Sequence, residues 1–241
     1  MPSKKVMVIS FSGIDGAGKS TQIEALQTHL QALGFRTCLY TFWDNVVVFS
    51  RFRENVSLKA FKGDKGIGSP DQPIHRRDKN VTSWHVTAVR LFLYLLDAYS
   101  LCLAVSRCSD ANAEFIIFDR YIYDELANLP LNQGPLRWYA RLLLGLAPKP
   151  DVAFIVDADP EAAHIRKPEY PLEFVRKNRD AYIALSRLVP GMTVLAPLAI
   201  EDTSAKINEA ISKTCLQTDF GGRELSQRHS ADSRPSKISS S

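Results

Sequence analysis

The chain has 241 residues, 45% hydrophobic and 23% charged, which is typical of a soluble globular protein with one sizeable α/β domain or at most two small ones. The net charge of +4 comes from scattered basic residues rather than one basic stripe, so we expect no nucleic-acid partner. The four cysteines have neither CxxC nor CxxH spacing, which disfavours a zinc site or a disulfide framework and indicates a reducing cytoplasm.

The N-terminus and one apolar run are the two places where a membrane signal could lie. The first residues carry two lysines, but only a short apolar run follows before a glycine-rich turn, as in a first strand rather than a signal peptide. The run at 91–105 is too short to span a bilayer and carries Asp97 in its middle. We therefore expect a buried helix there and no membrane association.

Strand and helix patterns alternate along the chain. Strands are expected at 5–11, 36–42, 114–119, 151–157 and 192–197. Helices are expected at 19–33, from about 82 to 108, from 120 onward, and at 134–146, 159–166, 172–188 and 201–213. This order predicts a five-stranded parallel sheet with helices on both faces.

The composition along the chain indicates where the folded domain ends. Residues 44–80 read as an irregular polar segment between the second strand and the long helix. Beyond about residue 216 the chain is rich in Ser, Arg, Asp and Gly and nearly lacks large apolar residues. The sequence therefore predicts one domain at 1–215 and a disordered tail at 216–241.

A phosphate-binding loop follows the first strand. Gly13, Gly18, Lys19 and Ser20 match the pattern G-x-x-x-x-G-K-S/T, and a strand precedes and a helix follows it. Glycines let successive backbone N–H groups turn inward toward an anion, and the helix N-terminus adds positive charge. Lys19 is expected to reach the β- and γ-phosphates, and the Ser20 hydroxyl to bind Mg²⁺. Every residue of this loop is a candidate ATP contact: Gly13, Ile14, Asp15, Gly16, Ala17, Gly18, Lys19, Ser20 and Thr21.

The third strand ends in an Asp-Arg pair. No N/T-K-x-D guanine motif occurs, and the strand does not end in the Asp-Glu typical of ATP-driven motors. Asp119 is placed to orient Mg²⁺ through water, and Arg120 to neutralise charge during phosphoryl transfer. The alternative is that the pair forms only a structural ion pair.

Three motifs together resemble the thymidylate kinase family of nucleoside monophosphate kinases: "FSGIDGAGKSTQ", "DRY" after the third strand, and "PDVAFIVDADPEAA" before a basic break. The resemblance runs from about residue 6 to 213 and is weak at 43–81. It implies a P-loop NTPase fold with a short lid at about 163–173, ATP as phosphoryl donor, Mg²⁺ as cofactor and a nucleoside monophosphate as acceptor. Family members commonly dimerise through long helices, which implies a possible homodimer.

The resemblance also assigns roles around the phosphates. Asp15 would meet the 3′-hydroxyl of the acceptor sugar, unless it only caps a turn. Position 16 is Gly rather than the Arg of one branch of the family, so the catalytic cation should come from the lid, where Arg166 stands first. Lys167 and Arg179 are further lid cations. All three could instead belong to a solvated helix face.

The acceptor pocket departs from the family pattern on the long helix. Tyr94 occupies the aromatic position that stacks on thymine, but Ala98, next to Asp97, occupies the position of the base-reading arginine. Arg90, one turn earlier, could substitute for that arginine or could snorkel at the helix surface.

A second departure follows the Asp-Arg-Tyr motif, where Asp124 stands in place of a serine. Near the acceptor phosphate the nearest basic candidates are Arg51 and Arg53. Acceptor-binding candidates are thus Asp15, Arg90, Tyr94, Arg120 and Asp124.

Three functions remain open from the sequence. The first is a thymidylate kinase-like enzyme. The second is a P-loop kinase for a non-nucleotide molecule, with Asp124 or Asp97 bonding a hydroxyl; an alcohol acceptor would need Asp124 to take its proton, whereas a phosphate acceptor would need no base. The third is a regulatory nucleotide-binding protein with little turnover. For all three functions, residues 197–199 are candidates for contact with the adenine of ATP.

Overall fold

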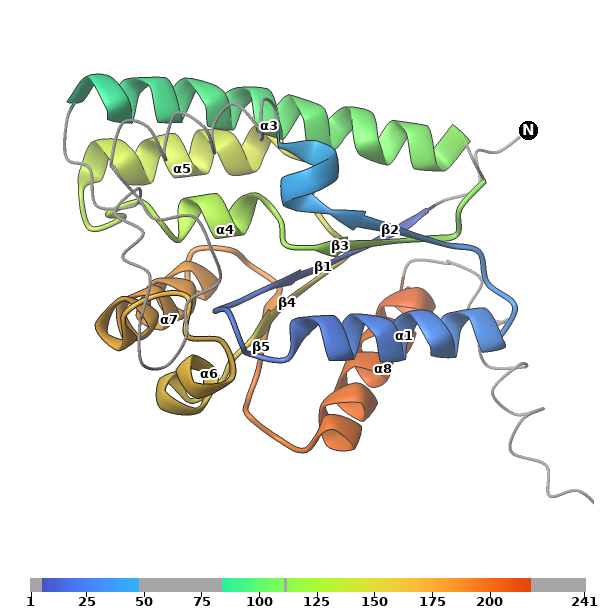
Figure 1. Ribbon diagram of the computed structural model, residues 1–241. Coiled ribbons are helices and arrows are strands. Elements are labelled where there is room, and N and C mark those ends of the chain that lie inside the picture. Colours follow the sequence, from blue (N-terminus) through green and yellow to red (C-terminus); the bar gives the residue numbers. More distant parts are fainter. Residues whose placement is uncertain (1–5, 48–83, 111, 218–241) are drawn as a thin grey trace, which may run out of the picture.

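A five-stranded parallel sheet forms the centre of the computed structural model, which describes residues 6–47, 84–110 and 112–217 (Figure 1). The strand order is β2-β3-β1-β4-β5, and every pairing is parallel. The strands are β1 (Met7–Ser12), β2 (Thr37–Thr41), β3 (Phe115–Asp119), β4 (Val152–Val156) and β5 (Met192–Leu195). All five strands were predicted from the sequence, and the predicted fold class is confirmed.

Helices cover both faces of the sheet (Figure 1). One face carries α1 (Lys19–Ala32) and α8 (Ile200–Gln217). The other face carries α3 (Trp84–Asp110), α4 (Ile122–Leu126) and α5 (Gly134–Leu146). Alternate residues of the buried strands supply the two cores, since neighbouring side chains point to opposite faces. In β3, for example, Phe115 and Ile117 pack with α1 and α8, whereas Ile116 and Phe118 pack with α3, α4 and α5.

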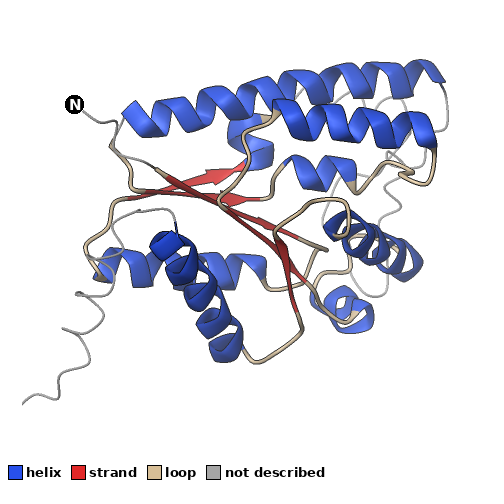
Figure 2. Cartoon of the chain, turned by 180° about the vertical axis from the view of Figure 1, so that it is seen from behind, coloured by secondary structure: helices blue, strands red, loops and turns tan. Residues whose placement is uncertain are grey.

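Two further helices lie beyond the carboxyl ends of the strands, as both ribbon views show (Figures 1 and 2). They are α6 (Pro160–Arg166) and α7 (Leu172–Ser186), with a five-residue link at 167–171 between them. The Asp159 side chain caps α6 by accepting a hydrogen bond from the Ala162 N–H at 2.9 Å. The predicted lid at 163–173 therefore falls on the junction of these two helices.

Three boundaries differ from the predicted ones. The second strand ends at Thr41 and continues as a π-helical turn, η1 (Phe42–Val46), because Phe42 and Val46 bury their side chains in the core. The helix predicted from 120 begins at Ile122, because Arg120 has a positive φ of 69°. Helix α8 continues to Gln217, past the predicted domain boundary, and the rest of the predicted tail lies outside the described residues.

Helix α3 is longer and more apolar than the predicted run. Its stretch Ala88–Ser109 has 22 residues and a mean hydropathy of 1.7, long and apolar enough to cross a membrane by length and composition alone. The expectation that the run is too short was therefore wrong. Ala98, Leu101 and Ala104 of this helix are buried against the sheet and α5, while only 28% of its apolar window is buried.

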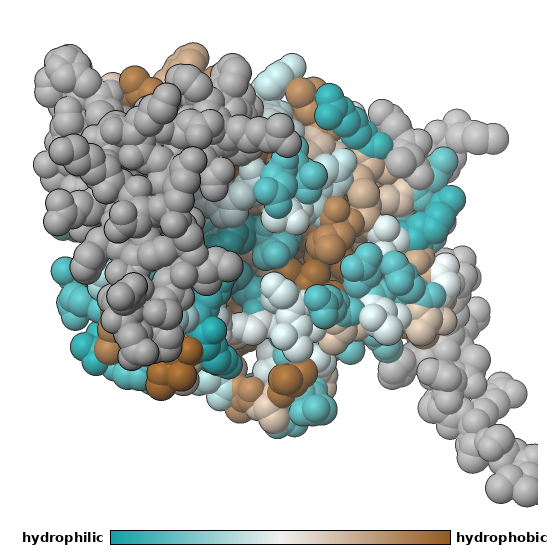
Figure 3. Space-filling model, viewed as in Figure 1, coloured by the Kyte–Doolittle hydropathy of each residue, from teal (hydrophilic) through white to brown (hydrophobic). Residues whose placement is uncertain are grey.

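The coloured part of the surface in Figure 3 is mostly hydrophilic or of intermediate hydropathy. A group of hydrophobic side chains shows at the middle of this face, over the sheet, with hydrophilic residues around it. Consistent with this, Leu39 of the edge strand β2 is 42% exposed, which leaves part of the sheet edge open to solvent.

Candidate functional site

The loop between β1 and α1 has the backbone of a phosphate cradle. Gly13, Gly16 and Gly18 have φ values of 141°, 79° and 90°, all in the region that favours glycine. A Cβ at Gly13 would lie 2.5 Å from the Val156 carbonyl oxygen, so only glycine fits there. The loop therefore curls tightly against the end of β4 and leads directly into the N-terminus of α1.

Lys19 lies across this loop. Its Nζ donates hydrogen bonds to the carbonyl oxygens of Gly13 (3.0 Å) and Ile14 (2.8 Å), and the residue is 6% exposed. Burial, together with the positive charge of Arg120, lowers the pKa of Lys19 from 10.5 to about 8. A phosphate bound in the cradle would bring negative charge next to the Lys19 ammonium and would stabilise its charged form. Ser20 and Thr21 follow it and are exposed.

Arg120 is held in a strained position between two carboxylates. Its backbone has a left-handed φ of 69°, and its N–H donates to the Phe11 carbonyl at 2.8 Å. The guanidinium donates from Nη1 to Asp124 Oδ1 at 2.7 Å and from Nη2 to Asp15 Oδ1. Burial alone would lower the pKa of Arg120, but Asp124 and Asp15 raise it above its usual range. Arg120 therefore joins the cradle to α4 as a permanent cation.

Asp124 is occupied by four donors and is 2% exposed. Oδ1 accepts from Arg120 and from the Tyr182 hydroxyl, both at 2.7 Å. Oδ2 accepts from the Ser12 hydroxyl at 2.6 Å and the Tyr121 backbone N–H at 3.1 Å. A carboxylate offers about four lone-pair sites, so none is left for an acceptor's proton. In the structure Asp124 therefore anchors the Arg120 guanidinium, and its predicted contact with an acceptor stays a prediction.

Ser12 and Tyr182 complete this site. Ser12 ends β1 and is fully buried, and Tyr182 of α7 is 2% exposed. The sequence analysis assigned no role to Ser12 or Tyr182. The available signal was a polar residue at the buried end of β1, directly before Gly13, because such a hydroxyl must find a partner.

Asp119 ends β3 beside Arg120 and is half-buried. Burial raises the pKa of Asp119, with Asp124 and Asp15 adding to the rise and Lys19 and Arg120 opposing it. Within the described ranges no group of three or more His, Cys, Asp or Glu side chains is placed to hold a metal. The hydroxyl of Ser20 and the carboxylate of Asp119 are hard oxygen donors, which fit a Mg²⁺ that keeps waters and phosphate oxygens as its other ligands.

Helix α6, where the sequence predicts the lid to begin, packs directly on the cradle. A Cβ at Gly16 would lie 2.3 Å from the Ala163 carbonyl oxygen. No larger residue, arginine included, fits at position 16 while α6 lies here. The structure therefore gives a physical reason for the glycine.

The three lid cations have different surroundings. Arg179 forms a two-pronged pair with Asp157, at 2.6 and 2.7 Å, and Lys167 lies 3.3 Å from Glu169. Arg166 is exposed, donates from Nε to the Ala162 carbonyl at 3.2 Å, and makes no ion pair with the described residues. Arg166 is thus the lid cation with its charge uncommitted in the described chain.

The predicted base pocket on α3 is less open than expected. Tyr94 and Ala98 lie in the core cluster that joins α3 to the sheet, and Asp97 is fully buried. Arg90, one turn before Tyr94, is half-buried. The structure thus brings Asp15, Arg120 and Asp124 together, while Tyr94 lies in the core and Arg51 and Arg53 fall outside the described residues.

Comparisons with known proteins agree with this fold. A probable thymidylate kinase of Pyrobaculum aerophilum is 31% identical over 213 residues, which cover 85% of this chain and 96% of that protein. A probable thymidylate kinase of Thermococcus kodakarensis is 27% identical and covers 86% of this chain and 96% of its own length. No family model matches.

A solved structure supports the fold. The crystal structure of thymidylate kinase from Ehrlichia chaffeensis aligns with a TM-score of 0.55 at 19% identity, covering 86% of this chain and 98% of that one. With a relative above 30% identity across nearly its whole length, and with the parallel sheet and phosphate loop in place, the chain belongs to the thymidylate kinase family and is a phosphotransferase.

Proposed function

We propose that the protein is an ATP- and Mg²⁺-dependent nucleoside monophosphate kinase that converts dTMP to dTDP. One observation carries the proposal: Arg120 is held by Asp124 and Asp15 at the mouth of a phosphate cradle that contains Lys19. Two anionic phosphates must approach each other in this reaction, and a fixed cation between donor and acceptor sites reduces their repulsion.

The donor phosphates would lie on the backbone N–H groups of the loop at 13–20 and at the N-terminus of α1. Lys19 would exchange its two carbonyl partners for phosphate oxygens. Mg²⁺, when bound through Ser20 and the water shell of Asp119, would neutralise the donor phosphates. Arg166 would add positive charge from the lid and help exclude water, which prevents wasteful hydrolysis of ATP.

The acceptor would bind at Arg120. A guanidinium has five N–H donors, and the bonds to Asp124 and Asp15 use two of them, so up to three remain for a phosphate. A phosphate monoester is already anionic near neutral pH and needs no base. This chemistry fits a site in which Asp124 has no free lone pair.

A second candidate is a related kinase with a different acceptor. It is favoured by Ala98, which is fully buried where the family resemblance implies a base-reading arginine. Such an enzyme would keep the donor cradle and Arg120 but would hold another phosphorylated molecule.

An ADP-release assay with Mg-ATP distinguishes these functions. The acceptors are dTMP, dUMP, dCMP, dAMP, dGMP and a set of non-nucleotide phosphate monoesters and alcohols. We expect dTMP to give the highest kcat/KM. No turnover with any nucleotide, with ATP binding intact, would contradict the proposal, and turnover with a non-nucleotide acceptor would then support the second candidate.

We also propose that two copies of the chain associate through α3. Val89, Phe92, Tyr99 and Leu103 are 59, 60, 64 and 39% exposed, and their spacing of three to four residues (with Leu96 between) places them on one stripe of the helix. Analytical ultracentrifugation should show a dimer that Phe92→Glu with Tyr99→Glu converts to a monomer. A monomeric wild type at micromolar concentration would exclude this association.

A further inference from the structure

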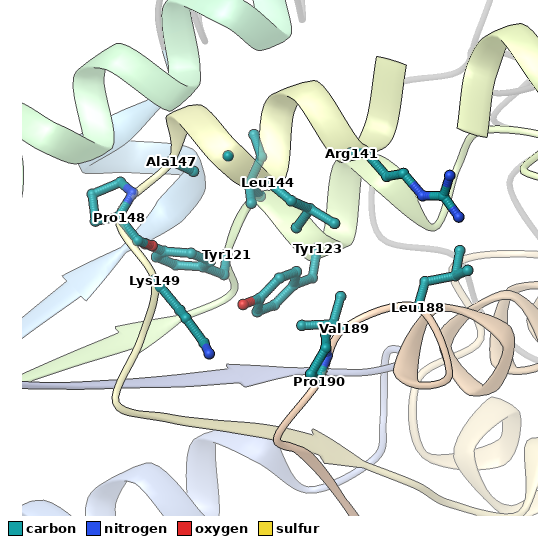
Figure 4. Close-up of a pocket in the computed structure, with 12 residues that line it drawn as sticks. Tyr121, Tyr123, Arg141, Leu144, Ala147, Pro148, Lys149, Leu188, Val189 and Pro190 are labelled. Atoms are coloured by element: carbon teal, nitrogen blue, oxygen red, sulfur yellow. The ribbon is translucent and has the colours of Figure 1, made fainter. Parts of the chain in front are cut away.

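A cavity of about 280 Å³ lies away from the phosphate cradle. Its walls are the first turn of α4, the last turns of α5, and the links at 147–149 and 188–190 that lead into β4 and β5 (Figure 4). None of the residues that line the cavity belongs to the loop at 13–21. The cavity is therefore separate from the phosphate cradle.

Most of the lining is apolar, but one hydroxyl is directed into it. Tyr123 is 3% exposed, and its hydroxyl points to the side on which Lys149 and Pro190 stand (Figure 4). Among the described residues this hydroxyl has no hydrogen-bond partner, whereas the hydroxyl of Tyr121, on the same wall, donates to the Pro148 carbonyl at 2.5 Å. Burial raises the pKa of Tyr123 above its usual range, so the group is a neutral donor at ordinary pH. An acceptor in the cavity could therefore take a hydrogen bond from this hydroxyl.

Two cations stand at the rim of the same cavity. Lys149 comes from the link before β4 and Arg141 from α5, and both are exposed. Neither makes an ion pair within the described part of the chain. Their positions on two different elements at opposite sides give an apolar cavity a positive rim (Figure 4).

We propose that this cavity binds a small carboxylic acid with an apolar body. The apolar part would lie on Leu144, Val189 and Pro190, while the carboxylate accepts a hydrogen bond from Tyr123 and pairs with Lys149. At about 30 Å³ per water the volume corresponds to about nine water molecules, which suits an aromatic or short aliphatic acid. Arg141, on the other rim, would attract the anion without contacting it directly.

The site is built next to the catalytic arginine in the sequence. Tyr121 and Ile122 line the cavity and directly follow Arg120, and Asp124, which orients Arg120, is in the same short helix. An occupant would therefore pack against the element that holds the active-site cation. The binding proposal itself rests on the cavity alone and does not depend on the acceptor of the kinase reaction.

Binding of 4-fluorophenylacetate, followed by ¹⁹F NMR, tests the proposal on the full chain. We expect saturable binding with a Kd of about 0.1–1 mM, as is usual for a ligand of this size. The neutral analogue 2-(4-fluorophenyl)ethanol has the same apolar body and should bind at least about tenfold more weakly. Tyr123→Phe and Lys149→Gln should each weaken binding of the acid by about tenfold.

Two controls separate this cavity from other anion sites. Lys206→Gln removes an exposed cation on α8, on the opposite face of the sheet, and should leave binding unchanged. Lys19→Ala, in the phosphate cradle, should also leave it unchanged. Any of four results overturns the proposal. They are no saturable binding by wild type up to about 10 mM ligand, equal affinity for the acid and the neutral analogue, no effect of Lys149→Gln, or loss of binding in Lys19→Ala.

Discussion

The donor and acceptor sides of the active site are built in different ways. The donor cradle consists of nine consecutive residues, Gly13–Thr21, whose glycine conformations and lysine are all local features. The proposed acceptor side depends on Ser12, Asp15, Arg120, Asp124 and Tyr182, which come from β1, the cradle, the link after β3, α4 and α7. A motif of consecutive residues keeps its geometry in any protein that contains it. In a network of residues from several elements, one residue can be substituted if its contact residues are substituted with it. The comparison explains how the chain can keep the family's phosphate loop and vary its acceptor residues.

The largest expected effect comes from breaking the donor side. Lys19→Ala removes the cation that would bind the β- and γ-phosphates, and we expect kcat to fall at least about a thousandfold, the upper range for loss of one charge-stabilising donor. ADP release measures the change, and circular dichroism checks that the fold is intact. Turnover close to wild type would show that the cradle does not carry the reaction.

A single added methyl group at Gly16 tests the contact between the cradle and helix α6. In Gly16→Ala the new Cβ would lie 2.3 Å from the Ala163 carbonyl oxygen, so α6 must move. Gly191→Ala is a matched control, because Gly191 also has a positive φ (84°) but has no atom within 4 Å of a new Cβ. Both should lose about 1–2 kcal/mol for the left-handed backbone. In Gly16→Ala the collision should lower the free energy of unfolding by a further ~1–3 kcal/mol and should also reduce the activity.

Urea unfolding of the two variants measures this difference without nucleotide. Equal losses of stability in Gly16→Ala and Gly191→Ala would mean that α6 does not rest on the cradle.

The acceptor side can be loosened more gently through Tyr182. Tyr182→Phe removes the donor to Asp124 Oδ1 and keeps the ring, so Arg120 should lose orientation. We expect kcat to fall by about tenfold with little change in the KM for ATP, and the free energy of unfolding to fall by about 1 kcal/mol.

Tyr139→Phe is the control for this variant, since its hydroxyl donates to the Leu91 carbonyl at the edge of the core, away from Arg120. It should lose a similar free energy of unfolding and keep its kcat. A Tyr182→Phe enzyme that loses stability but keeps full kcat would assign Tyr182 a purely structural role.

A further expected effect is a pH dependence of stability from Lys19. Its pKa is about 8 in the folded chain and 10.5 ordinarily, so between these values the unfolded chain binds more protons. Stability then rises with pH in this window, by up to about 1.4 kcal/mol per pH unit. Lys19→Met should be more stable than wild type below pH 8, and this advantage should shrink between pH 8 and 10.5. An advantage that stays constant across this range would contradict the lowered pKa.

The fold and the cradle were predictable because their signals are local. The alternation of strands and helices gave all five strands in the right place, and the spacing from Gly13 to Ser20 gave the loop. The role of Asp124 could not be predicted, because a carboxylate next to a catalytic arginine reads equally as a base or as an anchor. Its contacts with Ser12 and Tyr182, 112 and 58 residues away, favour the anchor, and the sequence does not show them.

Gly16 shows a similar limit. The sequence indicated that the missing arginine at this position shifts the catalytic cation to the lid, but not that α6 fills the space itself. The prediction that Tyr94 contacts the acceptor has the same limit. The spacing of apolar residues along α3 does not show which of them face the core and which face a cleft.

The most direct test of this account compares two acceptors that differ by one phosphate. With Mg-ATP, ³¹P NMR would follow product formation from dTMP and from thymidine by the wild-type chain. Because Asp124 has no lone pair left to take a proton from an alcohol, we predict dTDP from dTMP and no product from thymidine. Phosphorylation of thymidine with no reaction of dTMP would contradict both the anchoring role of Asp124 and the proposed acceptor.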